Sequence, residues 1–151
     1  MVDVKSKVSP EEWQARQDLA AFYRTVPYFK WDDLIFTHIS AKVPGTEDEF
    51  LINPYGFLFD EITASNLVKV DLKGKILSDT NNFINPAGFT IHSAIHEARE
   101  DAHCIVHLHS NDGVAVASLK DGLLPLSQTG MLVRSQISYH DYEGVALFDD
   151  E

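Results

Sequence analysis

The stretch Ile105-Val106-His107-Leu108-His109 decides how this chain is interpreted, because it joins a strand-forming apolar run to two histidines one residue apart. An extended backbone alternates its side chains, so both imidazoles are expected on one face, close enough to share a cation. Paired strand histidines also hydrogen-bond within protein cores, and the spacing alone favours neither interpretation. A transition-metal site needs at least one further ligand, which the rest of the sequence has to supply.

Composition and charge narrow the class of protein. A chain of 151 residues, of which 44% are hydrophobic and 23% charged, is expected to form one globular domain. The net charge of −11 argues against nucleic acid or an anionic membrane as the partner, because both are bound through lysine and arginine. A small molecule or another protein is therefore the expected partner.

The single cysteine, Cys104, excludes an intrachain disulfide and favours a reducing compartment, so we expect a cytoplasmic protein. Cys104 adjoins the apolar run and is predicted to be buried, which argues against a nucleophile there. Residues 1–5 lack the apolar run of a signal peptide, and no stretch approaches transmembrane length. The sequence also has no Gly-x-Ser-x-Gly elbow and no phosphate-binding glycine loop.

The first half of the chain predicts one helix followed by short strands. Ser9-Pro10-Glu11-Glu12 is a capping box that starts a helix ending near Val26. Its predicted buried stripe is Ala15, Leu19, Phe22 and Val26. Strands are then predicted at residues 36–43, 50–53, 57–59 and 67–72, with a short helix at 63–66 and a return through 75–77.

The second half predicts two helices around the histidine strand. Asn85-Pro86 opens a helix to about Glu100, and a buried strand at residues 104–108 follows it. A helix at 111–120, ended by Gly122, is expected to pack back on the sheet. Strands are predicted at 137–139 and 145–148. The acidic residues 149–151 look like the first turn of another helix, so we expect the chain to be a fragment.

Other histidines are weaker candidates. His92 and His96 are neighbours on one helix face, but the sequence between them lacks the glutamate of a zincin motif, so we expect them under the sheet or in the same cleft. His38, His103 and His140 are isolated and are expected to be structural or exposed. Asn53-Pro54-Tyr55-Gly56 is first a turn, although its backbone N–H groups are able to face an anion.

Several of these segments together resemble the class II aldolase/adducin N-terminal domain family, from about Trp13 to Glu151, with residues 1–12 as an extension and helix start. The segments that carry the resemblance are Thr37-His38-Ile39-Ser40, Leu51-Ile52-Asn53-Pro54-Tyr55-Gly56, Ala64-Ser65-Asn66-Leu67-Val68, His107-Leu108-His109 and Tyr139-His140-Asp141-Tyr142-Glu143-Gly144.

The resemblance implies a three-layer α/β/α domain around a largely antiparallel sheet, incomplete at its C-terminus. In the sugar-phosphate aldolases of this family, a zinc or similar ion is held by a His-x-His pair and a later third histidine, and it polarises the substrate carbonyl and stabilises an enediolate. His107 and His109 match the pair, whereas the third histidine would lie beyond Glu151. Zinc binding by this chain is therefore expected to be weak or absent.

The chain also departs from those aldolases. The resemblance places their acid/base glutamate at Gly88, and their two phosphate-binding serines at Pro86 and Ala87. The forms Asn85-Pro86-Ala87-Gly88-Phe89, Ser93-Ala94-Ile95 and Tyr139-His140-Asp141-Tyr142 are closer to the adducin branch. In animal adducins this domain is a non-catalytic head joined to a tail that binds the cytoskeleton. We expect no such tail here, so cytoskeletal binding is not implied by the resemblance to the head domain.

Two functions remain open. The first is a metal-binding, aldolase-like lyase, or a catalyst of related carbonyl chemistry, that acts on an unphosphorylated substrate and uses a base other than glutamate. The candidate bases are His92, His96, His140, Tyr139 and Asp141, and the candidate substrate contacts are Ser40, Asn53 and Gly56. The second is a non-catalytic module for self-association or protein binding. Both hypotheses predict a homo-oligomer.

Overall fold

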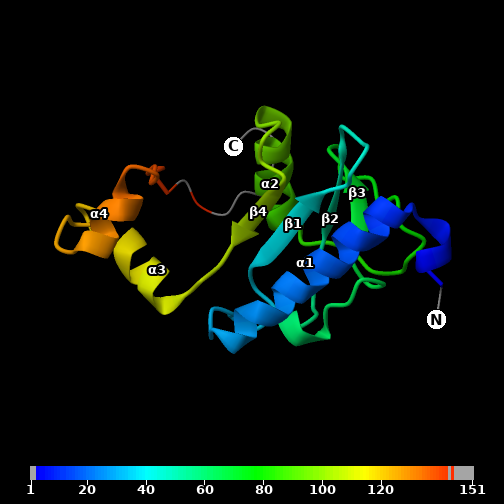
Figure 1. The fold of residues 1–151 in the computed structure, drawn as a ribbon, viewed down its shortest axis with the longest axis horizontal. Coiled ribbons are helices and arrows are strands. Elements are labelled where there is room, and N and C mark those ends of the chain that lie inside the picture. The colour runs from blue at the N-terminus through cyan, green and yellow to red at the C-terminus, as the bar shows by residue number, and fades with distance from the viewer. Residues whose placement is uncertain (1–2, 143, 145–151) are drawn as a thin grey trace.

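Four antiparallel strands form the sheet that carries most of the candidate histidines. Their order is β3-β2-β1-β4, and every neighbouring pair is antiparallel (Figure 1). The bounds are β1 His38–Lys42, β2 Glu49–Ile52, β3 Val68–Asp71 and β4 Cys104–His107. This computed structural model describes residues 3–142 and residue 144. Among these residues, no helix is long and apolar enough to cross a membrane.

Helix α1 (Pro10–Tyr28) confirms the predicted first helix and extends two residues past the predicted end. The Ser9 hydroxyl accepts the Glu12 N–H at 3.0 Å, which satisfies one of the free donors of the first turn. Leu19 and Val26 are buried as predicted, whereas Ala15 and Phe22 pack against the core only in part.

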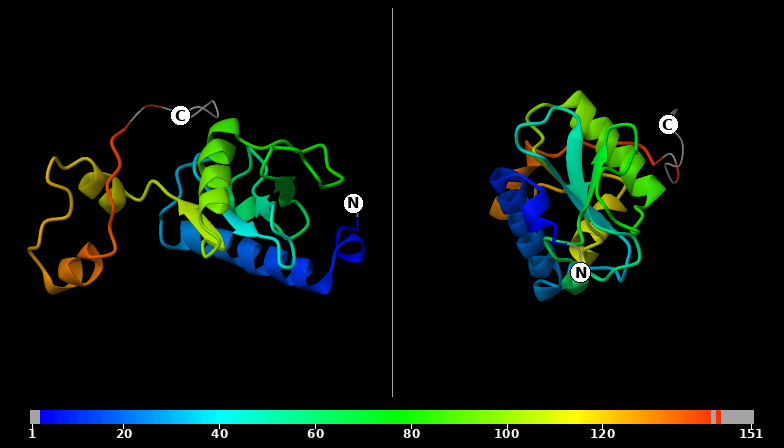
Figure 2. Two further views of the ribbon diagram at one scale, coloured as in Figure 1. Left: turned by 90° about the horizontal axis from the view of Figure 1, so that it is seen from above. Right: turned by 90° about the vertical axis from the view of Figure 1, so that its right-hand side faces the viewer.

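The sheet lies between two helices, which makes the three layers that were predicted (Figure 2). On one face, α1 packs over Ile39 and Leu51. On the other face, α2 (Pro86–Ala98) covers β1, and its Phe89 packs against Phe50 and neighbouring side chains of β2 and β3. This alternation follows from the two-residue period of a strand, and it places His38 and Ser40 on the α2 side.

A buried tyrosine holds β1 in place near the start of the strand. The Tyr23 hydroxyl accepts the N–H of Ile39 at 2.7 Å and lies 2.5 Å from the carbonyl oxygen of the same residue. It also lies 2.9 Å from Asn53 Oδ1. The pairing of β1 with β2 begins one residue later, at Ser40. The Tyr23 hydroxyl therefore satisfies the backbone N–H and carbonyl groups of Ile39, which a longer β2 would otherwise pair.

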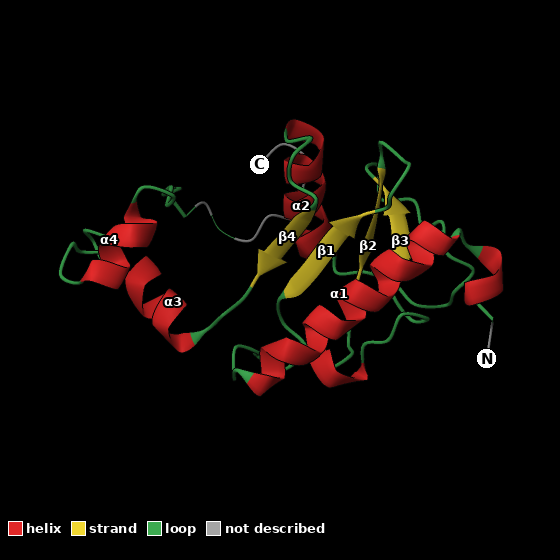
Figure 3. Ribbon diagram, in the orientation of Figure 1, coloured by secondary structure: helices red, strands yellow, loops and turns green. Residues whose placement is uncertain are grey.

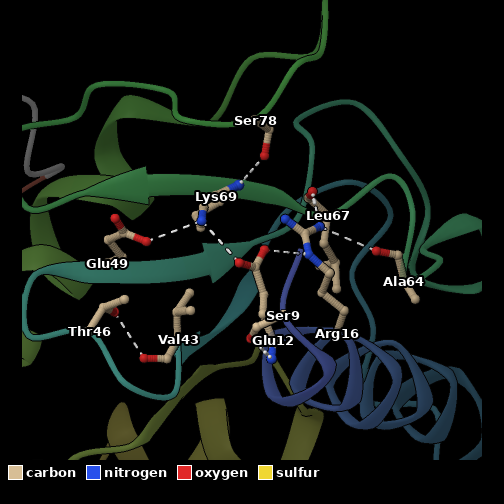
Figure 4. Close-up of polar contacts among 10 residues, drawn as sticks. All are labelled: Ser9, Glu12, Arg16, Val43, Thr46, Glu49, Ala64, Leu67, Lys69 and Ser78. Carbon is tan, nitrogen blue, oxygen red and sulfur yellow. Dashed lines mark hydrogen bonds and ion pairs between the residues drawn. The ribbon is translucent and has the colours of Figure 1, made fainter. Parts of the chain in front are cut away.

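Four charged side chains join the start of α1 to the opposite edge of the sheet (Figure 4). The buried Glu12 carboxylate contacts Arg16 Nε at 2.9 Å and Lys69 Nζ at 3.0 Å, and Lys69 also pairs with Glu49 at 3.2 Å. Arg16 donates further to the carbonyl oxygens of Ala64 and Leu67. We call Glu12, Arg16, Glu49 and Lys69 the ion quartet. Its formal charges sum to zero, and its two buried members, Glu12 and Arg16, pair directly with each other, while Lys69 and Glu49 are partly exposed.

Two predicted elements near β3 are wrong for local reasons. Residues 57–59 do not form a strand, because the Glu61 carboxylate accepts the Leu58 N–H at 2.8 Å and closes a 3-10 turn at Phe59–Glu61. Residues 63–66 form a turn rather than a helix. In that turn the side chains of Thr63 and Asn66 each accept the other's backbone N–H.

The predictions around β4 also need correction. β4 pairs only with β1 among the described strands and is an outer strand, so Cys104 is exposed and Val106 is 42% exposed rather than buried. The helix predicted at 111–120 is shorter (α3, Asn111–Ala117) and does not pack back on the sheet. Figures 2 and 3 show it with α4 (Gln128–Arg134), which was not predicted, to one side of the sheet.

The predicted final strands fare differently. Residues 137–139 are not a strand, because Tyr139 turns back to the loop between α3 and α4, where its hydroxyl accepts the Leu123 N–H at 2.7 Å. Residues 145–148 lie outside the described part of the chain. A 3-10 turn at Lys5–Lys7 precedes α1.

Candidate functional site

The pairing of β1 with β4 brings distant histidines together. His38 lies directly opposite His107 in the register, and their ring centroids are 4.8 Å apart. Opposite residues of an antiparallel pair project to the same face, which here is the face that α2 covers. The centre of this site is therefore a cluster of imidazoles between β1, β4 and α2.

The His107 and His109 rings lie 4.9 Å apart in an edge-on arrangement, so the alternation predicted from the sequence brings the two rings side by side. His109 Nδ1 lies 2.8 Å from the Asp33 carboxylate, which only accepts hydrogen bonds, so Nδ1 carries the proton in the neutral ring and Nε2 keeps its lone pair. A recess of about 430 Å³ lined by Asp33, His109, Asn111 and Val114 opens beside this pair.

His38 is packed against the first turns of α2. A Cβ atom on Gly88 would lie 2.6 Å from His38 Nε2 and under 3.0 Å from two further ring atoms. The imidazole therefore fills the space of a side chain at position 88. Burial, with His107 as a further cause, lowers the pKa of His38 to about 4, so the ring is neutral near pH 7.

His92 and His96 point from α2 to one serine of β1. Ser40 Oγ lies 2.6 Å from His92 Nδ1 and 2.8 Å from His96 Nε2, and His96 Nδ1 lies 3.1 Å from the carbonyl oxygen of Ala102. Burial lowers the pKa of His92 to about 2 and that of His96 to about 4. Both histidines are packed under the sheet, as predicted. The Ser40 hydroxyl, a predicted substrate contact, is hydrogen-bonded to both rings.

Several buried polar atoms of the cluster have no hydrogen-bond partner within the described residues. They are Thr37 Oγ1, His38 Nδ1, His38 Nε2, His92 Nε2 and His107 Nδ1. Buried polar atoms are paired in most proteins, and exceptions concentrate at functional sites. Four of the five are imidazole nitrogens from β1, β4 and α2, and Thr37 immediately precedes β1, which supports this cluster as the functional site.

The remaining predicted site residues lie elsewhere. Asn53 is buried with its side chain turned to Tyr23, and Gly56 is exposed in a turn with a φ of +89°. Tyr139 contacts Gly122 and Leu123. His140 and Asp141 are exposed in the same segment as Tyr139.

The histidine pair fits two positions of a divalent metal site. Asp33 orients His109 in the way that carboxylates orient metal-ligating histidines, and the unpaired Nδ1 of His107 is a second donor. Within residues 3–142, however, no three His, Cys, Asp or Glu side chains are placed to hold one metal ion. The described residues thus supply part of a coordination sphere.

Sequence reasoning missed the roles of His38 and Asp33. The two-residue spacing of His38 and Ser40 in a predicted strand indicated that both side chains project to the same face of the sheet. Neither the opposition of His38 to His107 nor the contact of Asp33 with His109 is visible without the register of β1 on β4.

The fold and the site define an α/β/α domain with paired histidines at its outer strand and a histidine-bearing helix above them. The family model of the Class II Aldolase and Adducin N-terminal domain matches residues 17–149, and the chain belongs to this family.

Relatives of known name agree with this assignment. The "Putative aldolase class 2 protein" of Caulobacter vibrioides is 64% identical over 97% of this chain, which covers 57% of that relative. Alpha-adducin of Rattus norvegicus is 48% identical over 90% of this chain and 19% of its own length. An aldolase II superfamily protein from Pseudomonas syringae has a TM-score of 0.92 and 53% identity, over 97% of this chain and 60% of that one. The chain thus spans little more than half of these two bacterial proteins.

Proposed function

We propose that this domain contributes to a divalent-metal site for carbonyl chemistry of the aldolase type, acting on a small unphosphorylated substrate. The observation that carries the proposal is the His107–His109 pair, with Asp33 behind His109 and the unpaired His38 ring beside His107. A carboxylate behind one histidine of the pair is the usual arrangement of metal-ligating histidines, which favours a metal site over a pure scaffold. The names of the bacterial relatives point to the same chemistry.

Each residue has a separate task in this proposal. His107 and His109 would hold the metal, which supplies Lewis-acid polarisation of a carbonyl when bound. His38 is neutral and carries an unshared nitrogen lone pair beside this pair, so it is our candidate to accept a proton from the carbon next to that carbonyl. In this proposal, His38 acts as the base in place of the glutamate that the related aldolases have at position 88.

The start of α2 supports an unphosphorylated substrate. Free N–H groups at a helix N-terminus commonly bind phosphate. Here Asn85 Oδ1 already accepts the Ala87 N–H at 3.2 Å, and Pro86 has no N–H to offer.

A second candidate function is self-association or protein binding without catalysis. The observation that favours it is the number of large apolar side chains exposed in and around α3 and α4. These are Val114, Leu119, Leu124, Leu126, Met131, Leu132, Val133, Ile137, Tyr139 and Tyr142. Apolar surface of this kind marks interaction sites, and alpha-adducin is among the relatives.

Zinc titration by calorimetry tests the metal assignment. The wild-type chain should bind zinc weakly, because two imidazoles leave the other positions to water, and His107→Ala and His109→Ala should remove the binding. His103→Ala is the matched control, since His103 is exposed and immediately precedes the same strand. Equal zinc binding by the wild type and His107→Ala would contradict the assignment.

Proton exchange tests the chemistry. With zinc present, dihydroxyacetone in D₂O should lose its carbon-bound proton signals, because the C–H bond breaks, the proton passes to His38 and a solvent deuteron replaces it. His38→Gln should lower the rate to that of zinc in buffer. If the wild type is already at that rate and sedimentation shows oligomers that Leu126→Asp dissociates, the second function is favoured.

A further inference from the structure

The recess of about 430 Å³ beside His109 is lined from two distant parts of the chain. Asp33 comes from the segment before β1, whereas His109 follows β4, and Asn111 and Val114 belong to α3. The Asp33 carboxylate lies 2.8 Å from His109 Nδ1, so the two sides of the recess are joined at a member of the proposed metal pair. A molecule whose carbonyl is held at that pair would therefore extend into this recess.

Asp33 brings a carboxylate to the recess with one oxygen still available. The Phe36 N–H donates to the carbonyl oxygen of Asp33 at 2.9 Å, which closes a turn and fixes the backbone there. The contact of its side chain with His109 uses Oδ2, and within the described residues Oδ1 has no partner. Oδ1 is thus able to accept a hydroxyl proton from a ligand, while the same charge repels a ligand carboxylate.

Asn111 brings a primary amide to the same recess. It is the first residue of α3, but the capping role belongs to Ser110, whose hydroxyl accepts the Gly113 N–H at 3.3 Å. Among the residues that the structure describes, the Asn111 side chain has no hydrogen-bond partner. An amide both donates and accepts, so it suits a hydroxyl group better than it suits a charged group.

Val114 supplies the apolar part of the lining. It lies three residues after Asn111 and is therefore on the same face of α3. Its side chain is 46% exposed. A branched apolar wall beside a carboxylate and an amide fits a short carbon chain that carries hydroxyl groups.

We propose that Asp33 and Asn111 are specificity-determining residues, which select an uncharged hydroxy ketone or hydroxy aldehyde over a 2-oxo acid of the same size. A hydroxyl group next to the carbonyl would donate to Asp33 Oδ1 and share a hydrogen bond with Asn111. A carboxylate in the same place would meet the charge of Asp33. The inference rests on the proposed function for the chemistry at the carbonyl, whereas the selection itself belongs to the metal-free recess.

Dihydroxyacetone and hydroxypyruvate are matched probes, because they differ only at one end, which is a hydroxymethyl group in the first and a carboxylate in the second. Each is titrated into the metal-free chain, and NMR follows the side-chain amide of Asn111 and the methyl groups of Val114. Dihydroxyacetone should shift both sets of signals and bind about 5- to 10-fold more tightly than hydroxypyruvate. Equal affinities, or no shift with dihydroxyacetone, would overturn the proposal.

Two variants change the charge of the recess in opposite directions. Asp33→Asn should remove the preference for dihydroxyacetone, because the repelling charge is lost. Asn111→Asp should increase the preference, because it adds a second carboxylate. An Asn111→Asp variant that binds the two probes as the wild type does would remove Asn111 from the recess.

Asp112→Asn is the matched control. It removes one negative charge from the exposed first turn of α3 without changing the lining of the recess, so it should keep the wild-type preference. Equal effects of Asp112→Asn and Asp33→Asn would mean that the net charge of the chain makes the selection, and would overturn the proposal. These titrations contain no metal, so a failure of zinc binding would contradict the proposed function and leave their outcome unaffected.

Discussion

His38 and Gly88 share one space: a Cβ atom at position 88 would lie 2.6 Å from His38 Nε2. Gly88→Ala should therefore destabilise the domain by about 1–3 kcal/mol, the usual cost of overpacking, although glycine to alanine in an open helix stabilises by about 1 kcal/mol. Urea unfolding measures the change. In the His38→Ala background the same substitution should become neutral or stabilising, and a stabilised Gly88→Ala single variant would contradict the packing.

Acid should weaken the fold through His92 and His96. Their pKa values are lowered to about 2 and about 4 in the folded state, against 6.5 when exposed. Below pH 6.5 these two histidines bind protons in the unfolded chain but stay neutral in the folded chain, so the free energy of unfolding falls as the pH falls. The slope is about 1.4 kcal/mol per pH unit for each such histidine.

Urea midpoints between pH 7.5 and pH 4.5 measure this slope. His38, His96 and His107 add to the lowering of the pKa of His92, and Lys42 adds to that of His96, while Glu47, Asp48, Glu97 and Glu100 line the cavity beside His96 and are not among the causes of its shift. His96→Gln should reduce the slope, and the exposed control His103→Gln should leave most of it. Stability that is unchanged down to pH 4.5 would rule out buried neutral rings.

Glu12→Gln should cost about 3–5 kcal/mol, because it leaves Arg16 buried without its carboxylate and removes one of the two partners of Lys69. Glu11→Gln is a close control, since Glu11 lies in the same first turn but is exposed. Its effect should stay within about 0.5 kcal/mol. Equal losses in the two variants would show that the helix dipole, rather than the ion quartet, is responsible.

Asp33→Asn should weaken the metal affinity of the His107–His109 pair by about 10- to 100-fold, because the carboxylate orients the His109 ring. Both partners of this contact are partly exposed, so the free energy of unfolding should change little. Zinc calorimetry beside the exposed neighbour variant Asp32→Asn checks this. Identical affinities in the two variants would remove Asp33 from the site.

Tyr23→Phe should destabilise the domain by about 1–3 kcal/mol, since the backbone N–H of Ile39 and the Asn53 side chain lose their buried partner. Tyr28→Phe, at a tyrosine that is 80% exposed in the last turn of the same helix, should have little effect. Thermal or urea unfolding compares the two, and a neutral Tyr23→Phe would mean that water replaces the hydroxyl.

Local patterns predicted what local physics decides. The Ser9 cap, the strands β1 to β3 and the proximity of His107 to His109 follow from signals a few residues long. The failures have two sources. First, side-chain hydrogen bonds such as that of Glu61 form turns where short strands or helices were predicted. Second, the exposure of β4 depends on its place at the end of the strand order, which only the whole sheet defines.

The site shows the same division. Asp33 and His109 are 76 positions apart, and Ser40 and His92 are 52 apart, so no local spacing predicts either contact. From the sequence, Gly88 could be identified as the position where the related aldolases have a glutamate. The sequence did not predict that the His38 imidazole occupies the space of that side chain, because this depends on how α2 packs on the sheet.

The ion quartet also bears on how the domain responds to heat. The free energy cost of desolvating charged groups falls as the temperature rises. An ion-pair network is therefore weakened less by heating than other contacts are. The quartet ties α1 to β2 and β3, while β4 is held by β1 alone among the described strands. Melting should therefore begin at the histidine edge and reach the quartet last, so heating would disturb the histidine cluster while the part of the sheet held by the quartet is still folded.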